Sequence, residues 1–104
     1  MIIAVSATEA DYNSAGVDPR FGRCAYFITY NTETDEWNSI SNSAREAMGG
    51  AAIQAVDLLK KKGVDIIITG NLGPNATSAL KAAGIEIIPG VTGKVKDAVE
   101  SHKK

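Results

Sequence analysis

Short apolar runs alternate with polar turns along the chain and predict five strands. The first is a continuous apolar run, which is typical of a buried strand. The second and third are rich in aromatic and β-branched residues, and the polar residues between them predict a hairpin turn. The predicted strands are Ile2–Val5, Cys24–Tyr30, Trp37–Ile40, Val64–Thr69 and Ile85–Ile88.

Two segments have the spacing of amphipathic helices and clear ends. The first helix follows Gly49 and Gly50, and Gly63 suits the left-handed conformation that often closes a helix. The second starts at Pro74, whose fixed φ favours the first helical position, and ends at Gly84. Each helix is followed directly by a predicted strand, so the pair forms two consecutive αβ units.

The remaining segments have weaker patterns. Residues 7–20 have no hydrophobic period and predict a long loop, which in compact domains is more often functional or disordered. Thr92 is placed to cap a third helix. The polar tail from Ser101 is expected to fray.

The order of these elements predicts one mixed α/β sheet. The first three strands form a meander, and right-handed crossovers add the last two as parallel neighbours. The simplest arrangement is the order 3-2-1-4-5, with only strand two antiparallel and with helices on both faces. A chain of 104 residues without a linker is expected to form a single domain over residues 1–104.

Strand direction brings several loops to one edge of this sheet. Ligands of open α/β sheets bind outside the carboxyl ends of the strands, which is this edge. Glycines there allow close approach of a ligand, and helix N-termini offer N–H groups and partial positive charge to an anion. The candidate binding residues at this edge are Arg20, Phe21, Gly22, Arg23, Cys24, Gly49, Gly50, Asn71 and Gly73.

Each candidate also has a purely structural interpretation. A glycine pair permits an ordinary chain turn, and Arg20 and Arg23 are also typical of solvated loops. Cys24, at the start of a strand, is also typical of a small buried residue. Residues 70–75 lack the lysine and hydroxyl of a P-loop and do not form GxGxxG.

Charge and composition narrow the classes of partner. Eleven basic and twelve acidic residues give a net charge of -1, which provides no electrostatic reason to expect nucleic acid. One cysteine excludes an internal disulfide and fits a reducing compartment. The apolar run at the start is too short for a signal peptide or a membrane span. We therefore expect a cytoplasmic protein with no membrane partner.

The sequence lacks the residues that a Ser–His–Asp site or a two-metal nuclease site would need. A single histidine, His102, lies in the tail, so no Ser–His–Asp set is expected. Ribonuclease-H-like enzymes share this sheet order but need carboxylates at the first strand for two metals. That strand ends here in Val5, Ser6 and Ala7. The sequence therefore predicts a binding protein that is not an enzyme.

Four segments together resemble the dinitrogenase iron–molybdenum cofactor biosynthesis family, which includes NifX-type carriers and the NifB carboxyl-terminal domain. They are Val17–Phe27, Gly49-Gly50, Gly63–Asp65 and Gly70–Ala76, and the similarity runs from about residue 1 to residue 100. The resemblance implies a ribonuclease-H-like, three-layer fold. It also implies that the protein binds an iron–sulfur or iron–molybdenum-type cluster, or its precursor, and exchanges it with a donor or acceptor protein.

One position departs from the family pattern. Cofactor carriers of this family often have histidine directly before the phenylalanine–glycine pair, whereas this chain has Arg20. A guanidinium does not ligate iron but pairs with an anion. Cys24 is the one soft side chain nearby and thus the candidate metal ligand, although a cluster is usually held by four thiolates. We expect an anionic metal cluster or oxyanion as ligand; the alternative is a protein-interaction or scaffold domain that keeps the fold without a ligand.

Overall fold

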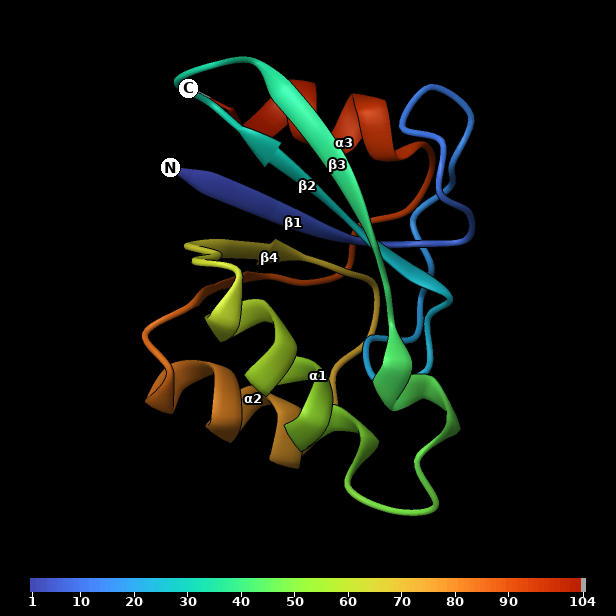
Figure 1. Cartoon of the computed structure of the whole chain (residues 1–104), viewed down its shortest axis with the longest axis vertical. Helices are drawn as coiled ribbons and strands as arrows, with labels where there is room; N and C mark the ends of the chain where they lie inside the picture. The colour runs from blue at the N-terminus through green and yellow to red at the C-terminus, as the bar shows by residue number, and fades with distance from the viewer. Residues whose placement is uncertain (104) are drawn as a thin grey trace.

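The computed structural model describes residues 1–103, and its core is a five-stranded sheet in the order β3-β2-β1-β4-β5 (Figure 1). β2 is antiparallel to both of its neighbours, and the β1–β4 and β4–β5 pairs are parallel. Both the predicted strand order and the predicted directions are confirmed. The strands are β1 (Ile2–Ala7), β2 (Tyr26–Asn31), β3 (Glu36–Ser41), β4 (Ile66–Ile68) and β5 (Glu86–Ile88).

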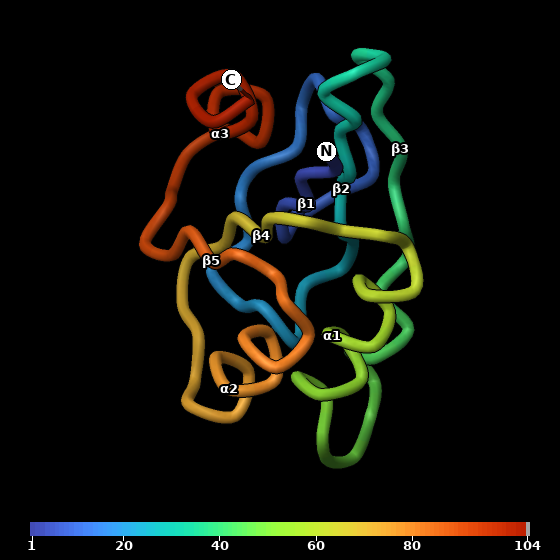
Figure 2. The backbone as a smooth tube through the Cα atoms, turned by 90° about the vertical axis from the view of Figure 1, so that its left-hand side faces the viewer, coloured from blue at the N-terminus to red at the C-terminus, as the bar shows by residue number. Residues whose placement is uncertain are grey.

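Helices cover both faces of the sheet, which gives three layers. α1 (Ala51–Lys61) and α2 (Pro74–Ala82) lie side by side on one face, and α3 (Val95–His102) lies on the other (Figure 2). A short 3-10 helix, η1 (Ser43–Glu46), connects β3 to the loop before α1. The structure confirms the predicted three-layer α/β fold.

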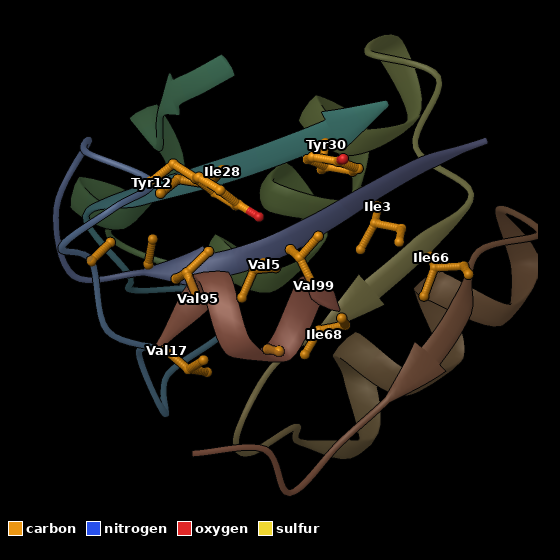
Figure 3. Close-up of a cluster of buried hydrophobic side chains, with 13 residues drawn as sticks. Ile3, Val5, Tyr12, Val17, Ile28, Tyr30, Ile66, Ile68, Val95 and Val99 are labelled. Atoms are coloured by element: carbon orange, nitrogen blue, oxygen red, sulfur yellow. The ribbon is translucent and has the colours of Figure 1, made fainter. Parts of the chain in front are cut away.

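The central strand β1 packs on both faces, which explains why its sequence is continuously apolar. Ile3 and Val5 belong to the cluster under α3, which Figure 3 shows, whereas Ala4 belongs to the cluster under α1 and α2. The long loop at residues 7–20 adds Tyr12 and Val17 to the α3 side. This loop is therefore packed against the core over part of its length.

Two expectations about the third helix are wrong. α3 begins at Val95 with Lys94 as its N-cap, so Thr92 is not the cap. The tail does not fray at Ser101, because α3 continues to His102, whose Nδ1 lies 2.9 Å from the Ala98 carbonyl oxygen. The part of that expectation that concerns Lys104 lies outside the described residues. Over residues 1–103, none of the helices is both long and apolar enough to cross a membrane.

Candidate functional site

The end of the long loop and the exit of β4 meet at the predicted edge of the sheet. Arg20 and Asn71 form an isolated parallel bridge, and the Asn71 N–H donates to the Pro19 carbonyl at 2.7 Å. Gly70 makes this approach possible, because a Cβ at this position would lie 2.6 Å from Pro19 Cα. The structure thus brings Arg20 and Asn71 together through a residue that sequence reasoning did not select.

Gly22 lies against the beginning of α1. A Cβ at Gly22 would lie 3.1 Å from the Ala52 nitrogen and 3.2 Å from Ala52 Cα. Gly50, the N-cap of α1, has a left-handed backbone at φ 68°. Both Gly50 and Gly49 before it are exposed. The segment around Gly22 is therefore next to the glycine pair, as the predicted topology required.

The guanidinium of Arg20 is held by a buried carboxylate. Its Nε and one terminal nitrogen donate to the two carboxylate oxygens of Asp18 at 3.2 and 3.1 Å, and its backbone N–H donates to Asp18 at 2.9 Å. Burial alone raises the pKa of Asp18, but these hydrogen bonds and the charges of Arg20 and Arg45 outweigh it, so this pKa lies below its ordinary value. The Arg20 side chain stays 65% exposed and is fixed in direction.

Arg23 fixes the chain that leads into α1. One of its terminal nitrogens donates to the carbonyls of Arg45 and Ala47, both at 2.7 Å. Within residues 1–103, Arg23 has no carboxylate within 4 Å. Arg45 is exposed on η1 and was not predicted, because nothing in the pattern indicated a helical turn there. The edge thus carries three guanidinium groups, and among the described residues Arg20 alone of the three is paired with a carboxylate.

Phe21 and Cys24 form the inner wall of this edge and do not face solvent. Phe21 packs on Phe27 with ring centroids 5.5 Å apart, and the Cys24 thiol donates to the Phe21 carbonyl at 3.3 Å. Burial, followed by the charge of Asp18, raises the pKa of Cys24 to about 12. To ligate a metal, Cys24 would have to lose its proton and become exposed, so its role as a ligand stays a prediction.

This burial predicts that the Cys24 thiol reacts only slowly with alkylating reagents in the folded protein. Alkylation needs the thiolate, and a thiol with a pKa of about 12 is almost wholly protonated at pH 8. We expect iodoacetamide to react with native protein at least about 100-fold more slowly than with protein in urea. Mass spectrometry over time measures both rates. Equal rates in the two conditions would show that Cys24 is exposed or that its pKa is not raised.

Asn42 holds the turn before β2 together, and sequence reasoning missed it. It is buried, and its side-chain amide donates to the carbonyls of Gly22 and Cys24 at 3.1 and 2.9 Å. Its carbonyl oxygen accepts from the Ala44 N–H and so caps η1. A single asparagine after a strand carries no sequence signal for such a role.

Two of the helices that start at this edge, α1 and α2, have no side-chain cap at their N-termini. The N-caps of α1 and α2 are Gly50 and Gly73, and neither helix has a side-chain cap or an acidic residue in its first turn. Helix N-termini usually receive a side-chain oxygen or a carboxylate, which satisfies their N–H groups. Both termini are therefore available to an external acceptor.

A pocket of about 590 Å³ lies beside this edge, between α2 and the ends of β4 and β5. It shares Asn71 with the edge, and Lys81 is its one charged lining residue. Its lining does not include the other predicted residues. The lining residues are Gly70, Asn71, Leu72, Thr77, Lys81, Ile87, Pro89 and Gly90.

The donor set of this edge favours ion pairing and hydrogen bonding over metal coordination. In the part of the chain that the structure describes, no three His, Cys, Asp or Glu residues gather as a metal site. Guanidinium groups, an exposed amide and open helix N-termini all donate to anions. The residues present thus fit a negatively charged group that arrives with its own ligands.

A family model described as dinitrogenase iron-molybdenum cofactor matches residues 1–104. The chain belongs to this family. Among curated proteins it is 32% identical over 87 residues to the uncharacterized protein MJ0580 of Methanocaldococcus jannaschii. That match covers 81% of this chain and 74% of the relative.

Two solved structures have the same fold as this chain. The apo form of the orange protein from Desulfovibrio gigas matches with a TM-score of 0.91 and 36% identity, over 95% of this chain and 83% of that one. A Thermotoga protein solved by NMR as a candidate NifB protein matches with a TM-score of 0.82 and 34% identity, over 96% and 84% of the two chains. Both the predicted family and the predicted fold are confirmed.

Proposed function

We propose that this chain binds an anionic metal cluster of the iron–sulfur or iron–molybdenum type, or its precursor, as cargo that it exchanges with a donor or acceptor protein. The observation that carries the proposal is the pair of uncapped helix N-termini beside exposed arginines. Membership of a family named for a metal cofactor supports the same class of ligand.

The edge is suited to a preformed cluster because its donors converge from several elements. The Arg20 guanidinium is fixed by Asp18, and Arg23 is fixed by two carbonyls, so little side-chain freedom is lost on binding. The N–H groups of α1 and α2 add partial positive charge without a competing carboxylate in their first turns. Inorganic sulfides of a cluster accept hydrogen bonds from such donors.

Reversible contacts of this kind also suit a carrier. A cluster held by charge and hydrogen bonds leaves without breaking a bond between protein and metal, and such contacts weaken with salt. Cys24 remains a proposed ligand only if the cargo opens the wall formed by Phe21 and Cys24. If a Cys24→Ser variant retains the cargo, Cys24 is not a ligand.

The test combines anaerobic reconstitution with one substitution at the start of α2. We expect Gly73→Asp to raise the free energy of unfolding by a few tenths of a kcal/mol, because aspartate caps a helix and the site has room for a Cβ. The same carboxylate should weaken binding about tenfold, because it occupies the N–H groups and repels an anion. Urea denaturation, and metal analysis with visible spectra after addition of iron and sulfide, give the two readouts.

Two controls make the result specific. Gly73→Ser caps α2 without adding charge, and Lys61→Ala removes a positive charge at the opposite end of α1.

Amide shifts during titration with molybdate should centre on the candidate edge and leave residues 31–36 and 60–63 unchanged. Loss of uptake in Lys61→Ala but not in Gly73→Asp would contradict this location. Absence of any uptake by the wild-type chain would favour the scaffold alternative.

A further inference from the structure

β3 is an open edge of the sheet without the usual protection. It is the last strand in the order, its side chains are almost all exposed, and it runs along the margin of the molecule (Figure 2). Natural edge strands commonly carry lysine, proline or a bulge that prevents pairing with another strand. β3 reads EWNSIS and pairs with β2 in an unbroken register, so it has none of these.

The backbone groups that point away from the sheet can be assigned. The Asn42 N–H donates to the Ala25 carbonyl, which continues the β2–β3 register by one residue. In an antiparallel ladder, both backbone groups of a residue point to the same side and alternate along the strand. Even-numbered residues of β3 thus bond to β2, whereas Trp37, Ser39 and Ser41 present N–H and C=O groups outward.

We propose that β3 pairs antiparallel with β3 of a second copy of this chain, around a two-fold axis at Asn38. This register gives hydrogen-bonded pairs between Trp37 and Ser39 of the two copies, which both have outward backbone groups. Asn38 then faces Asn38 of the second copy. The result is a continuous ten-stranded sheet across the dimer, in a symmetric interface of one patch with itself.

Charge complementarity selects this register. Ile40 is in register with Phe27, which packs under α1 and α2, so Glu36, Asn38 and Ile40 share that face. A hollow of about 340 Å³ on this face is lined by Asn38, Ile40 and Lys62, together with Ile2, Thr29 and Ser39. Centring the axis at Asn38 places Glu36 of the second copy opposite Ile40, at the mouth of this hollow.

The two charges that this register brings together have no ion-pair partner within residues 1–103. Neither Glu36 nor Lys62 has an opposite charge within 4 Å there. An axis at Ser39 would move Glu36 past the end of the strand, and an axis at Trp37 would pair residues of the hairpin turn. An axis at Ser39 also pairs residues within β3 (37–41), but the axis at Asn38 alone places Glu36 of each copy opposite Ile40 and so forms two Glu36–Lys62 pairs.

Sedimentation of the full chain at increasing concentration tests the dimer. We expect a reversible monomer–dimer equilibrium that Glu36→Lys and Lys62→Glu each weaken about tenfold, with recovery in the double variant. Asn13→Lys, on an exposed loop, is the control for an added positive charge and should leave the equilibrium unchanged. A wild-type chain that stays monomeric at about 1 mM overturns the proposal.

Cysteine cross-linking tests the register independently of the charges. Facing residues of a non-hydrogen-bonded pair lie about 4.5 Å apart at Cα, within the range of a disulfide. Asn38→Cys should therefore form a disulfide-linked dimer on mild oxidation, whereas Ser39→Cys, which faces Trp37, should not. The native Cys24 is buried and does not compete. Cross-linking of Ser39→Cys in preference to Asn38→Cys overturns the axis at Asn38.

Discussion

Gly70→Ala is expected to destabilise the fold by about 2–3 kcal/mol, the range in which an added atom forces the backbone apart. The new Cβ would lie 2.6 Å from Pro19 Cα and 3.1 Å from the Pro19 carbonyl oxygen. Both are backbone atoms, so no side-chain rotation relieves the clash. The loop at residues 17–20 has to move away from the end of β4, and the Asn71–Pro19 hydrogen bond is lost with it.

Gly73→Ala, three residues along the same connection, is the matched control. A Cβ at Gly73 meets nothing within 4 Å, and the φ of -81° is accessible to alanine. We expect this variant to keep the stability of the wild type within about 0.5 kcal/mol. Urea denaturation of both variants gives the comparison. Equal stability of the two variants would contradict the close packing of β4 against the long loop.

The sheet could be predicted from the sequence because its determinants are local and directional. The apolar runs fixed the strands, and the short connections at Gly63 and Gly84 left few topologies for two αβ units. The order then placed Arg20, Gly22, Gly50 and Asn71 at one edge without any knowledge of side-chain contacts. The structure has the same order and brings Arg20 to Asn71.

The contacts that organise this edge could not be predicted, because they depend on tertiary packing. Asp18 was part of a recognisable motif, but only the fold shows that it is buried and holds Arg20. Cys24 could have been a ligand or a buried residue on the sequence alone, and only the fold shows that burial and the charge of Asp18 raise the pKa of its thiol. The hydrogen bonds that Arg23 and Asn42 make at this edge join residues about twenty positions apart, where hydrophobic period carries no information.

Arg20→Ala should weaken cargo binding about tenfold and should also change how stability depends on pH. In the wild type, the pKa of Asp18 lies below its ordinary value of 3.8, so its ion pair stabilises the fold above that pH and is lost as the pH falls through the folded-state pKa. Without the Arg20 side chain, burial of the carboxylate is opposed by the backbone N–H of residue 20 and the charge of Arg45 but not by the guanidinium, so this pKa should rise. The variant then loses stability relative to the wild type, and this loss grows as the pH rises through the pKa of Asp18 towards neutrality.

The two variants of this ion pair separate binding from folding. The difference in unfolding free energy between the wild type and Arg20→Ala should be largest near pH 7 and should shrink as the pH falls below 3.8, because a protonated Asp18 needs no partner. Adding Asp18→Asn to Arg20→Ala removes the buried charge, so it should restore stability at pH 7 but not cargo binding. Urea denaturation across this pH range and metal uptake at pH 7 measure the two effects. A stability difference independent of pH would show that Arg20 does not act through Asp18, and uptake recovered with stability would assign Arg20 a structural role alone.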